Sequence, residues 1–251
     1  MTLQARVTKP VLENQWHLTV INDKIKLVHL YQVQESGWEC SEKQDRTKNT
    51  YKLRRHLARA RDMVFQYAYC NEWDFFFTGT IDATKRNRED LQDFERAFAK
   101  MVRNLRAKTK ADIQYLIIPE LHSDLKSWHC HGLIKGLPEE QVVSLREGKL
   151  SWRAYSRSFG FNDLSLIKNH EAVSKYLTKY ITKCFDGSGR GVVEKEKNLY
   201  IVSRGLKKGE TIKKGSIVAP IDREAKFEND FCQIYEFPIS ELDNLLKLYQ
   251  E

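Results

Sequence analysis

The sequence has little of what marks a secreted or membrane-bound protein. Its five cysteines are an odd, scattered set without a CxxC pair: Cys40, Cys70, Cys130, Cys184 and Cys232. This pattern argues against a disulfide framework and against a structural zinc ribbon. No apolar run approaches the ~20 residues that span a bilayer, and the N-terminal MTLQARVTKPVLENQW lacks the apolar core of a signal peptide. We therefore expect a cytoplasmic protein with no membrane partner.

The sequence also lacks the phosphate-binding loop G-x-x-x-x-G-K-[ST]. The stretch GSGRG at 187–191 has neither the lysine nor the spacing, so we interpret it as a flexible loop. A fused helicase is therefore not expected.

Positive charge is in excess and clustered. The formal net charge is +8 and the pI about 9.1. Three basic clusters stand out: KLRRHLARAR (52–61), RNLRAKTK (103–110) and RGLKKGETIKKG (204–215). Any one of them could simply be a solvated face. Together they suit a polyanionic partner such as nucleic acid.

Hydrophobic periodicity predicts a mixed fold. Alternating stretches in the first 45 residues, WHLTVI and KLVHLYQV, indicate short strands. Helical spacing of apolar residues predicts helices over 51–70, 89–106 and 168–184, and β-like stretches occupy 73–82, 112–122, 128–137 and 198–206. A last helix is expected to start at Ser240, whose spacing to Asp243 is that of a capping box.

The order of these elements predicts an α+β fold. The middle of the chain reads β-α-β-β-α-β, which indicates a central antiparallel sheet of about five strands with helices packed on it, as in ferredoxin-like and RNA-recognition-motif folds. We expect three regions: an N-terminal β-rich extension, a core domain, and a C-terminal extension ending in a helix, at 1–50, 51–206 and 207–251.

Two histidines lie close together in one predicted strand, SWHCHGLIKG (127–136). Side chains alternate across a strand, so His129 and His131 share one face and Cys130 points to the other. A single strand histidine is usually a surface or core residue satisfied by hydrogen bonds. Two of them on one face, with suitable neighbours, favour a metal site.

The preceding strand supplies such neighbours. A hairpin centred between residues 125 and 126 would place His122 opposite His129 and Glu120 opposite His131, and cross-strand partners share a face. These side chains would hold a divalent metal with open coordination positions, as catalysis requires. A one-residue slip in register would separate the pairs.

The stretch VSKYLTKYITK (173–183) predicts a helix that carries two tyrosines on one side. Tyr176 and Tyr180 are one turn apart, and each is followed three residues later by a lysine, Lys179 or Lys183. An amphipathic helix with boundary aromatics and snorkelling lysines would have the same pattern. A tyrosine also becomes a nucleophile where cations and a metal stabilise its phenolate.

Together these motifs resemble the HUH endonucleases, specifically the two-tyrosine rolling-circle replication initiator (Rep) proteins of phages and plasmids. The strand FFFTGTID (75–82) resembles the first family motif, ELHSDLKSWHCH the carboxylate and His-hydrophobic-His motif, and YLTKYITK the doubled YxxK helix. The resemblance covers residues 73 to 183.

The resemblance implies a metal-dependent, sequence-specific single-stranded DNA nickase and strand transferase, an endodeoxyribonuclease with a 5′-phosphotyrosine intermediate. It implies Mg²⁺ or Mn²⁺ as the cofactor, and single-stranded or extruded origin DNA, a host helicase and a host polymerase as partners in a bacterial cytoplasm. The residues implied are Tyr176, Tyr180, Lys179 and Lys183 for catalysis, and His129, His131, Glu120 and, ambiguously, His122 for the metal.

Two alternatives remain at the level of sequence. A relaxase or transposase shares the fold, although the doubled tyrosine favours a replication initiator. A non-catalytic RNA-binding module would use FFFTGTID as a stacking platform, but it leaves the histidines and the tyrosine helix without a role.

Overall fold

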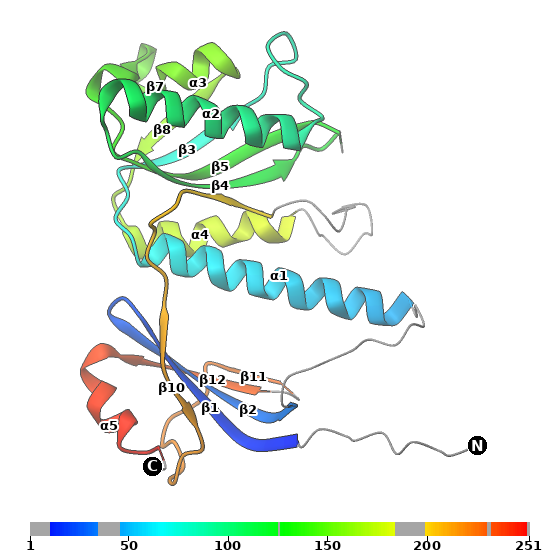
Figure 1. Ribbon diagram of the computed structural model, residues 1–251, viewed down its shortest axis with the longest axis vertical. Coiled ribbons are helices and arrows are strands. Elements are labelled where there is room, and N and C mark those ends of the chain that lie inside the picture. Colours follow the sequence, from blue (N-terminus) through cyan, green and yellow to red (C-terminus); the bar gives the residue numbers. More distant parts are fainter. Residues whose placement is uncertain (1–10, 35–45, 125, 184–198, 230–231, 250–251) are drawn as a thin grey trace. The chain divides into compact units, whose positions relative to one another are not determined.

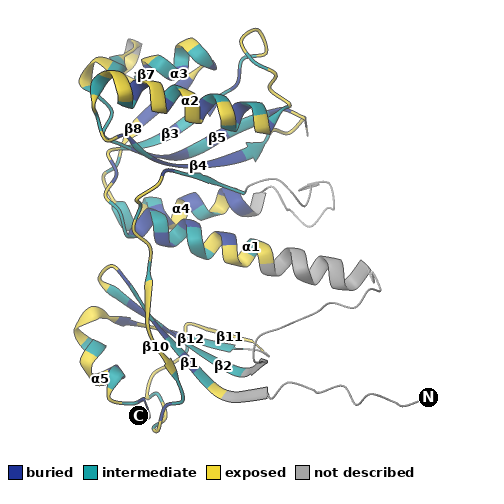
Figure 2. Ribbon diagram, viewed as in Figure 1, coloured by how far each residue is buried: buried dark blue, intermediate teal, exposed yellow. Residues whose placement is uncertain are grey.

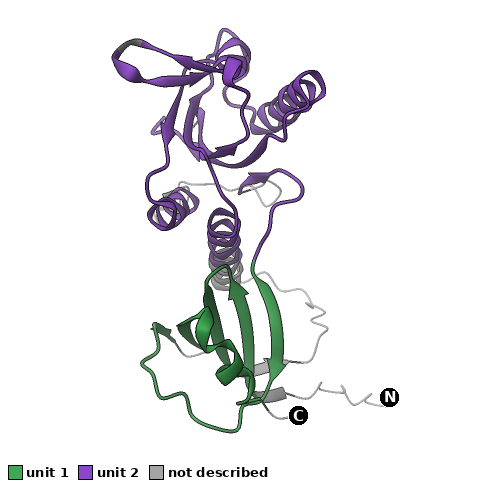
Figure 3. Cartoon of the chain, turned by 90° about the vertical axis from the view of Figure 1, so that its left-hand side faces the viewer, with its two compact units in different colours: residues 1–45, 209–251 green, residues 46–208 purple. Residues whose placement is uncertain are grey.

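The computed structural model describes residues 11–34, 46–124, 126–183, 199–229 and 232–249, with the backbone alone at 11–13, 32–34, 46–55, 146 and 182–183. The stretch GSGRG lies outside the described residues. The chain divides into two compact units, one of residues 1–45 and 209–251 and the other of residues 46–208 (Figure 3). The segments interpreted as N- and C-terminal extensions thus share a unit.

The first unit is a five-stranded antiparallel sheet. Its strand order is β10-β1-β2-β12-β11, with β1 at Val11–Ile21, β2 at Lys24–Gln34, β10 at Glu210–Gly215, β11 at Phe227–Glu228 and β12 at Cys232–Pro238. Alternate residues of β1, β2 and β12 form its core with α5 (Leu242–Leu246), among them Trp16, Leu18, Ile25, Leu27, Tyr235 and Leu245.

The capping box predicted at Ser240 is wrong. A 3₁₀ turn, η3, occupies Ile239–Glu241, and α5 follows it without a side-chain cap. The Ile239 N–H donates to the Asp23 carbonyl at 2.9 Å. Because this bond starts the turn directly after β12, Ser240 lies inside the turn and not at the start of the helix.

The second unit contains the larger sheet. Its order is β6-β7-β8-β3-β5-β4-β9, with β3 at Phe75–Thr80, β4 at Gln114–Leu121, β5 at Trp128–Lys135, β6 at Val142–Ser144, β7 at Leu150–Trp152, β8 at Asn162–Leu166 and β9 at Ile201–Val202. The short turns η1 (Glu139–Gln141) and η2 (Arg146–Gly148) flank β6. The α+β class is confirmed, although this sheet exceeds the expected five strands.

Helices cover both faces of this sheet (Figures 1 and 2). On one face lie α2 (Leu91–Thr109) and α3 (Arg153–Ser158), and on the other lie α1 (Arg46–Tyr69) and α4 (His170–Lys183). In β4, Ile117 joins the core under α2 and α3, whereas Leu116 and Ile118 join the core under α1 and α4. Coverage on both sides explains why β4 is a nearly continuous apolar run.

The closing half of the predicted β-α-β-β-α-β unit differs from the expectation. The elements that complete it are α3 and β8, which give the ferredoxin-like order β8-β3-β5-β4. Helix α4 packs on the opposite face, and β9 pairs with β4 at the sheet edge. The short elements α3 and β8 span too few residues for a clear periodic signal.

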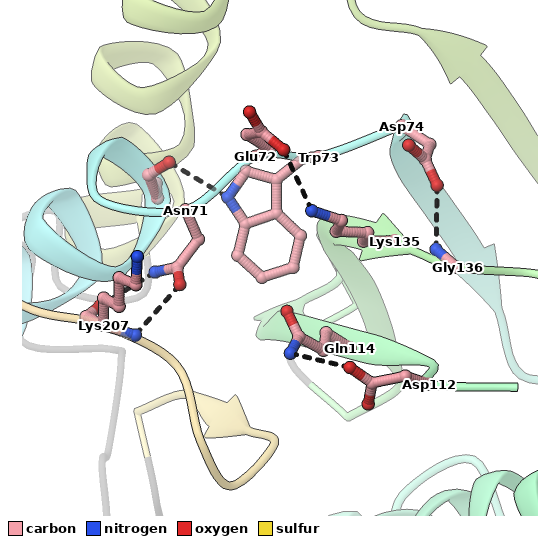
Figure 4. A network of polar contacts seen from close by, with 10 residues as sticks. Asn71, Glu72, Trp73, Asp74, Asp112, Gln114, Lys135, Gly136 and Lys207 are labelled. Carbon is pink, nitrogen blue, oxygen red and sulfur yellow. Dashed lines mark hydrogen bonds and ion pairs between the residues drawn. The ribbon is translucent and has the colours of Figure 1, made fainter.

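Polar contacts attach the end of α1 to the sheet (Figure 4). The Asn71 side chain exchanges hydrogen bonds with the Lys207 backbone at 2.8 and 2.9 Å. The Trp73 indole N–H donates to a carbonyl of α1, and Asp74 accepts the Gly136 N–H at 2.8 Å. Among the described residues, no helix combines the length and apolar character needed to cross a membrane.

Candidate active site

Strand β5 holds the two histidines on the face covered by α4. Thr78 of β3 lies opposite His131 in the ladder, and its hydroxyl is 3.3 Å from His131 Nδ1. Cys130 points to the other face, where its thiol is buried and donates to the Gly79 carbonyl at 3.4 Å. The predicted alternation of the HCH stretch is therefore confirmed.

The β4–β5 register differs from the prediction by two residues. Glu120 lies opposite His129, and not opposite His131. The His122 N–H donates to the Ser127 carbonyl at 2.8 Å, and the Asp124 carboxylate accepts both the Ser127 N–H and its hydroxyl. These bonds centre the hairpin one residue earlier than expected. Because a shift of two preserves the side-chain alternation, all four predicted residues stay on one face.

The side chains nevertheless meet in the predicted pairs, along diagonals of the ladder. Glu120 Oε2 lies 2.7 Å from His131 Nε2. The rings of His122 and His129 stack with centroids 4.7 Å apart at an interplanar angle of 14°. Diagonal neighbours lie within reach of long and aromatic side chains, so the two-residue error in register changed the backbone partners without separating the cluster.

The donor atoms of this cluster have the chemistry that a divalent metal requires. Burial first, and then the neighbouring charges of His122 and His131, lower the pKa of His129, which favours the neutral, ligating imidazole. Imidazoles and a carboxylate together suit Mn²⁺ and Mg²⁺. Within the described part of the chain, however, no three His, Cys, Asp or Glu side chains are already gathered to hold an ion. Glu120 and His131 bond to each other instead.

Helix α4 brings the tyrosines onto this face. The Asn169 side chain accepts the Ala172 N–H at 2.9 Å, an N-cap contact that sets where the helix begins. Leu177 and Ile181 enter the core, as predicted for its apolar stripe. The Tyr180 ring stacks on the His131 ring with centroids 3.8 Å apart at 15°.

The two tyrosines have different surroundings. Tyr180 is buried, and its hydroxyl donates to the Tyr176 hydroxyl oxygen at 2.8 Å. Burial first, and this hydrogen bond second, raise the pKa of Tyr180. Tyr176 is 44% exposed, and the Lys179 ammonium lies 5.0 Å from its ring centroid. The side chain of Lys183, at the end of α4, lies outside the described residues.

Sequence reasoning assigned no individual role to the residues of FFFTGTID. In the structure, Thr78 contacts His131, and Phe76 packs between the histidine and the tyrosines, with ring centroids 6.3 Å from His131 and 5.8 Å from Tyr176. The alternation of β3 was the available signal, because it places Phe76 and Thr78 on one face.

The basic clusters lie at the surface wherever their side chains are described. Arg59 and Arg61 of α1 are exposed, and so are Arg103 and Lys108 of α2. The third cluster spans both units, and its exposed cations are Arg204, Lys207, Lys208, Lys213 and Lys214.

Comparison with known proteins gives one family match. Residues 74–185 match the model of a family described as Replication-associated protein ORF2. The match spans less than half of the 251 residues, but it contains both the histidine strand and the tyrosine helix. Searches among curated proteins and among solved structures gave no match. The family match supports a role in initiating DNA replication.

Proposed function

We propose that this chain is a metal-dependent endodeoxyribonuclease that nicks and rejoins a specific single-stranded DNA site to initiate rolling-circle replication. The observation that carries the proposal is the stacking of Tyr180 on His131. It supports a single site formed by the two motifs, which lie in separate elements of the region matched by the replication family. The exposed cations suit contacts to the DNA backbone.

Residues Glu120, His129 and His131, with His122 beside them, would hold the metal. When bound, Mg²⁺ or Mn²⁺ would polarise the scissile phosphate and orient it for in-line attack. Thr78, through Nδ1, would fix the orientation of the His131 ring, as outer hydrogen bonds do for ligating histidines. For a metal to enter, the bond between Glu120 and His131 has to open.

The tyrosine oxygen would supply the nucleophile. It attacks phosphorus, the bond from phosphorus to the 3′ oxygen breaks, and the leaving oxygen takes up a proton to become a 3′-OH. The product is a 5′-phosphotyrosine, and the same steps in reverse rejoin the strand without ATP. Tyr176 is the better-placed first nucleophile, because its hydroxyl is exposed and accepts the Tyr180 hydrogen bond, which would support negative charge on its oxygen. Lys179 would add favourable charge beside it.

A covalent-adduct assay tests the proposal. The protein is incubated with circular single-stranded DNA and Mn²⁺, and the adduct is detected by its retarded migration under denaturing conditions. We expect adduct with the native sequence and none with His129→Ala or His131→Ala. The matched control is His56→Ala, which removes an exposed histidine of α1 and should react normally. Wild-type nicking by the double mutant His129→Ala/His131→Ala would refute the metal site.

The RNA-binding alternative finds no support in the structure. Phe77 is fully buried, Phe75 packs against the same core, and Phe76 lies under the rings of α4. An RNA-recognition sheet needs exposed aromatics on its strands. The phenylalanines of FFFTGTID are instead used in packing.

A further inference from the structure

One aromatic side chain stands exposed at the edge of the candidate site. Phe161 directly precedes β8, and 61% of its surface is exposed. Its carbonyl oxygen accepts the Thr80 N–H at 2.9 Å and the Thr80 hydroxyl at 3.1 Å. The backbone contact extends the β3–β8 ladder one pair beyond Gly79 and Asn162. The backbone at Phe161 is therefore held by the sheet even though the ring is not buried.

The ladder places Phe161 on the face that carries the histidines. Thr80 is the cross-strand partner of His129 in the β3–β5 pairing. Since cross-strand partners share a face, Phe161, Thr80 and His129 form a row over three adjacent strands. Strands lie ~4.8 Å apart, which puts the Phe161 and His129 backbones about 10 Å from each other. This spacing is within the reach of a nucleotide next to the scissile phosphate.

The neighbouring residue keeps this orientation fixed. Asn162 points to the opposite face, where it is buried, and its side chain accepts the Trp152 N–H at 2.7 Å. Because alternation along the strand then directs Phe161 toward the site, the exposure of its ring follows from the fold.

We propose that Phe161 stacks on a nucleobase of single-stranded DNA beside the scissile phosphate. The inference rests on the proposed function and adds a substrate-positioning residue to that site. Proteins that bind single strands combine cationic surfaces with exposed aromatic rings, because every base offers a π face. The chain carries a net charge of +8, and the phenylalanines of β3 are occupied in packing. Phe161 is left with an exposed ring on the site's face.

Binding without cleavage tests the stacking. The affinity for a mixed-sequence single-stranded oligodeoxynucleotide is measured in EDTA, so that nicking does not contribute. We expect Phe161→Ala to bind roughly 5- to 150-fold more weakly, the range for loss of one stacked base. The control is Leu166→Ala, which removes a 66% exposed apolar side chain of the same strand. Its position, five residues on, belongs to the other face by alternation, and its affinity should stay unchanged.

A fluorescent variant separates stacking from a structural role. Phe161→Trp should bind normally, and its added fluorescence should be quenched by the oligodeoxynucleotide, whereas Leu166→Trp should show no added quenching. Equal affinity of Phe161→Ala and the native sequence would overturn the inference. So would loss of self-association in Phe161→Ala at unchanged affinity, which would assign the ring to a protein contact. A Phe161-dependent preference for an oligoribonucleotide would make RNA the occupant.

The two proposals fail in different ways. If the native protein neither binds single-stranded DNA nor forms the covalent adduct, the proposed function falls and this inference falls with it. If the native protein forms the adduct while Phe161→Ala binds and reacts at the native level, only the stacking role is refuted.

Discussion

The hydroxyl of Tyr180 donates a hydrogen bond to the hydroxyl oxygen of Tyr176 across 2.8 Å, within one helix. The donor ring lies flat against His131, while the acceptor ring is exposed. This contact gives the two tyrosines different roles at any one moment. A modest shift of α4 or of the DNA would exchange those roles. Rolling-circle replication needs such an exchange, because after one circuit the first tyrosine still holds the old 5′ end.

The first prediction follows from that asymmetry. Tyr176→Phe should lower the initial rate of adduct formation by at least ~10-fold, because it removes the exposed nucleophile. Tyr180→Phe should lower it about 2- to 10-fold, the effect of losing one hydrogen bond. The double mutant should form no adduct. The rates are measured on an origin-containing oligonucleotide. A native rate for Tyr176→Phe, with complete loss for Tyr180→Phe, would reverse the assignment.

Thr78→Val is predicted to weaken metal binding without unfolding the protein. The change removes the hydroxyl 3.3 Å from His131 Nδ1 and conserves the side-chain shape. Outer hydrogen bonds to ligating histidines typically contribute about 10- to 100-fold in affinity. We therefore expect a rise of that size in the Mn²⁺ concentration for half-maximal nicking. Thr109→Val is the control, since its hydroxyl bonds only within α2, on the other side of the sheet. An unchanged Mn²⁺ requirement in Thr78→Val would contradict the role.

Binding to single-stranded DNA should depend strongly on salt. Contacts between cations and phosphates release counterions, with a log–log slope of about −0.7 for each phosphate on single strands. Replacing Arg103 and Lys108, which are exposed on α2, by glutamine should make the slope less negative if α2 contacts the DNA. Affinity measured between 50 and 200 mM salt (roughly the range over which such contacts weaken) tests this. An affinity independent of salt would remove the electrostatic part of the argument.

Cys130 is predicted to be inert in the folded protein. Burial raises the pKa of its thiol to about 12, against the smaller opposing effects of hydrogen bonds with Tyr155 and Gly79. The raised pKa keeps the thiol protonated through neutral and mildly alkaline pH, and the thiolate is the reactive form. Iodoacetamide at pH 8, followed by peptide mass spectrometry, should label Cys130 only after denaturation. Cys232, which is partly exposed, should react first. Equal labelling of both thiols in the native state would contradict the burial of Cys130.

Sequence alone determined which side chains could act together locally. The alternation of a strand places His129 and His131 on one face, and the pitch of a helix places Tyr176 and Tyr180 on one side. These relations depend only on neighbouring backbone geometry. They also tolerate error: the hairpin register was wrong by two residues, yet Glu120 and His122 stayed on the predicted face because two is the period of a strand.

Only the tertiary structure decided how these local groups combine. Periodicity does not say that α3 and β8 close the ferredoxin-like unit, that α4 covers the opposite face, or that the two ends of the chain share one sheet. The contact between Tyr180 and His131 depends on that choice of face, which is set by the packing of Leu116, Leu133 and Leu177 in one core. Such packing sums many weak contacts between distant segments. No local pattern in the sequence records it.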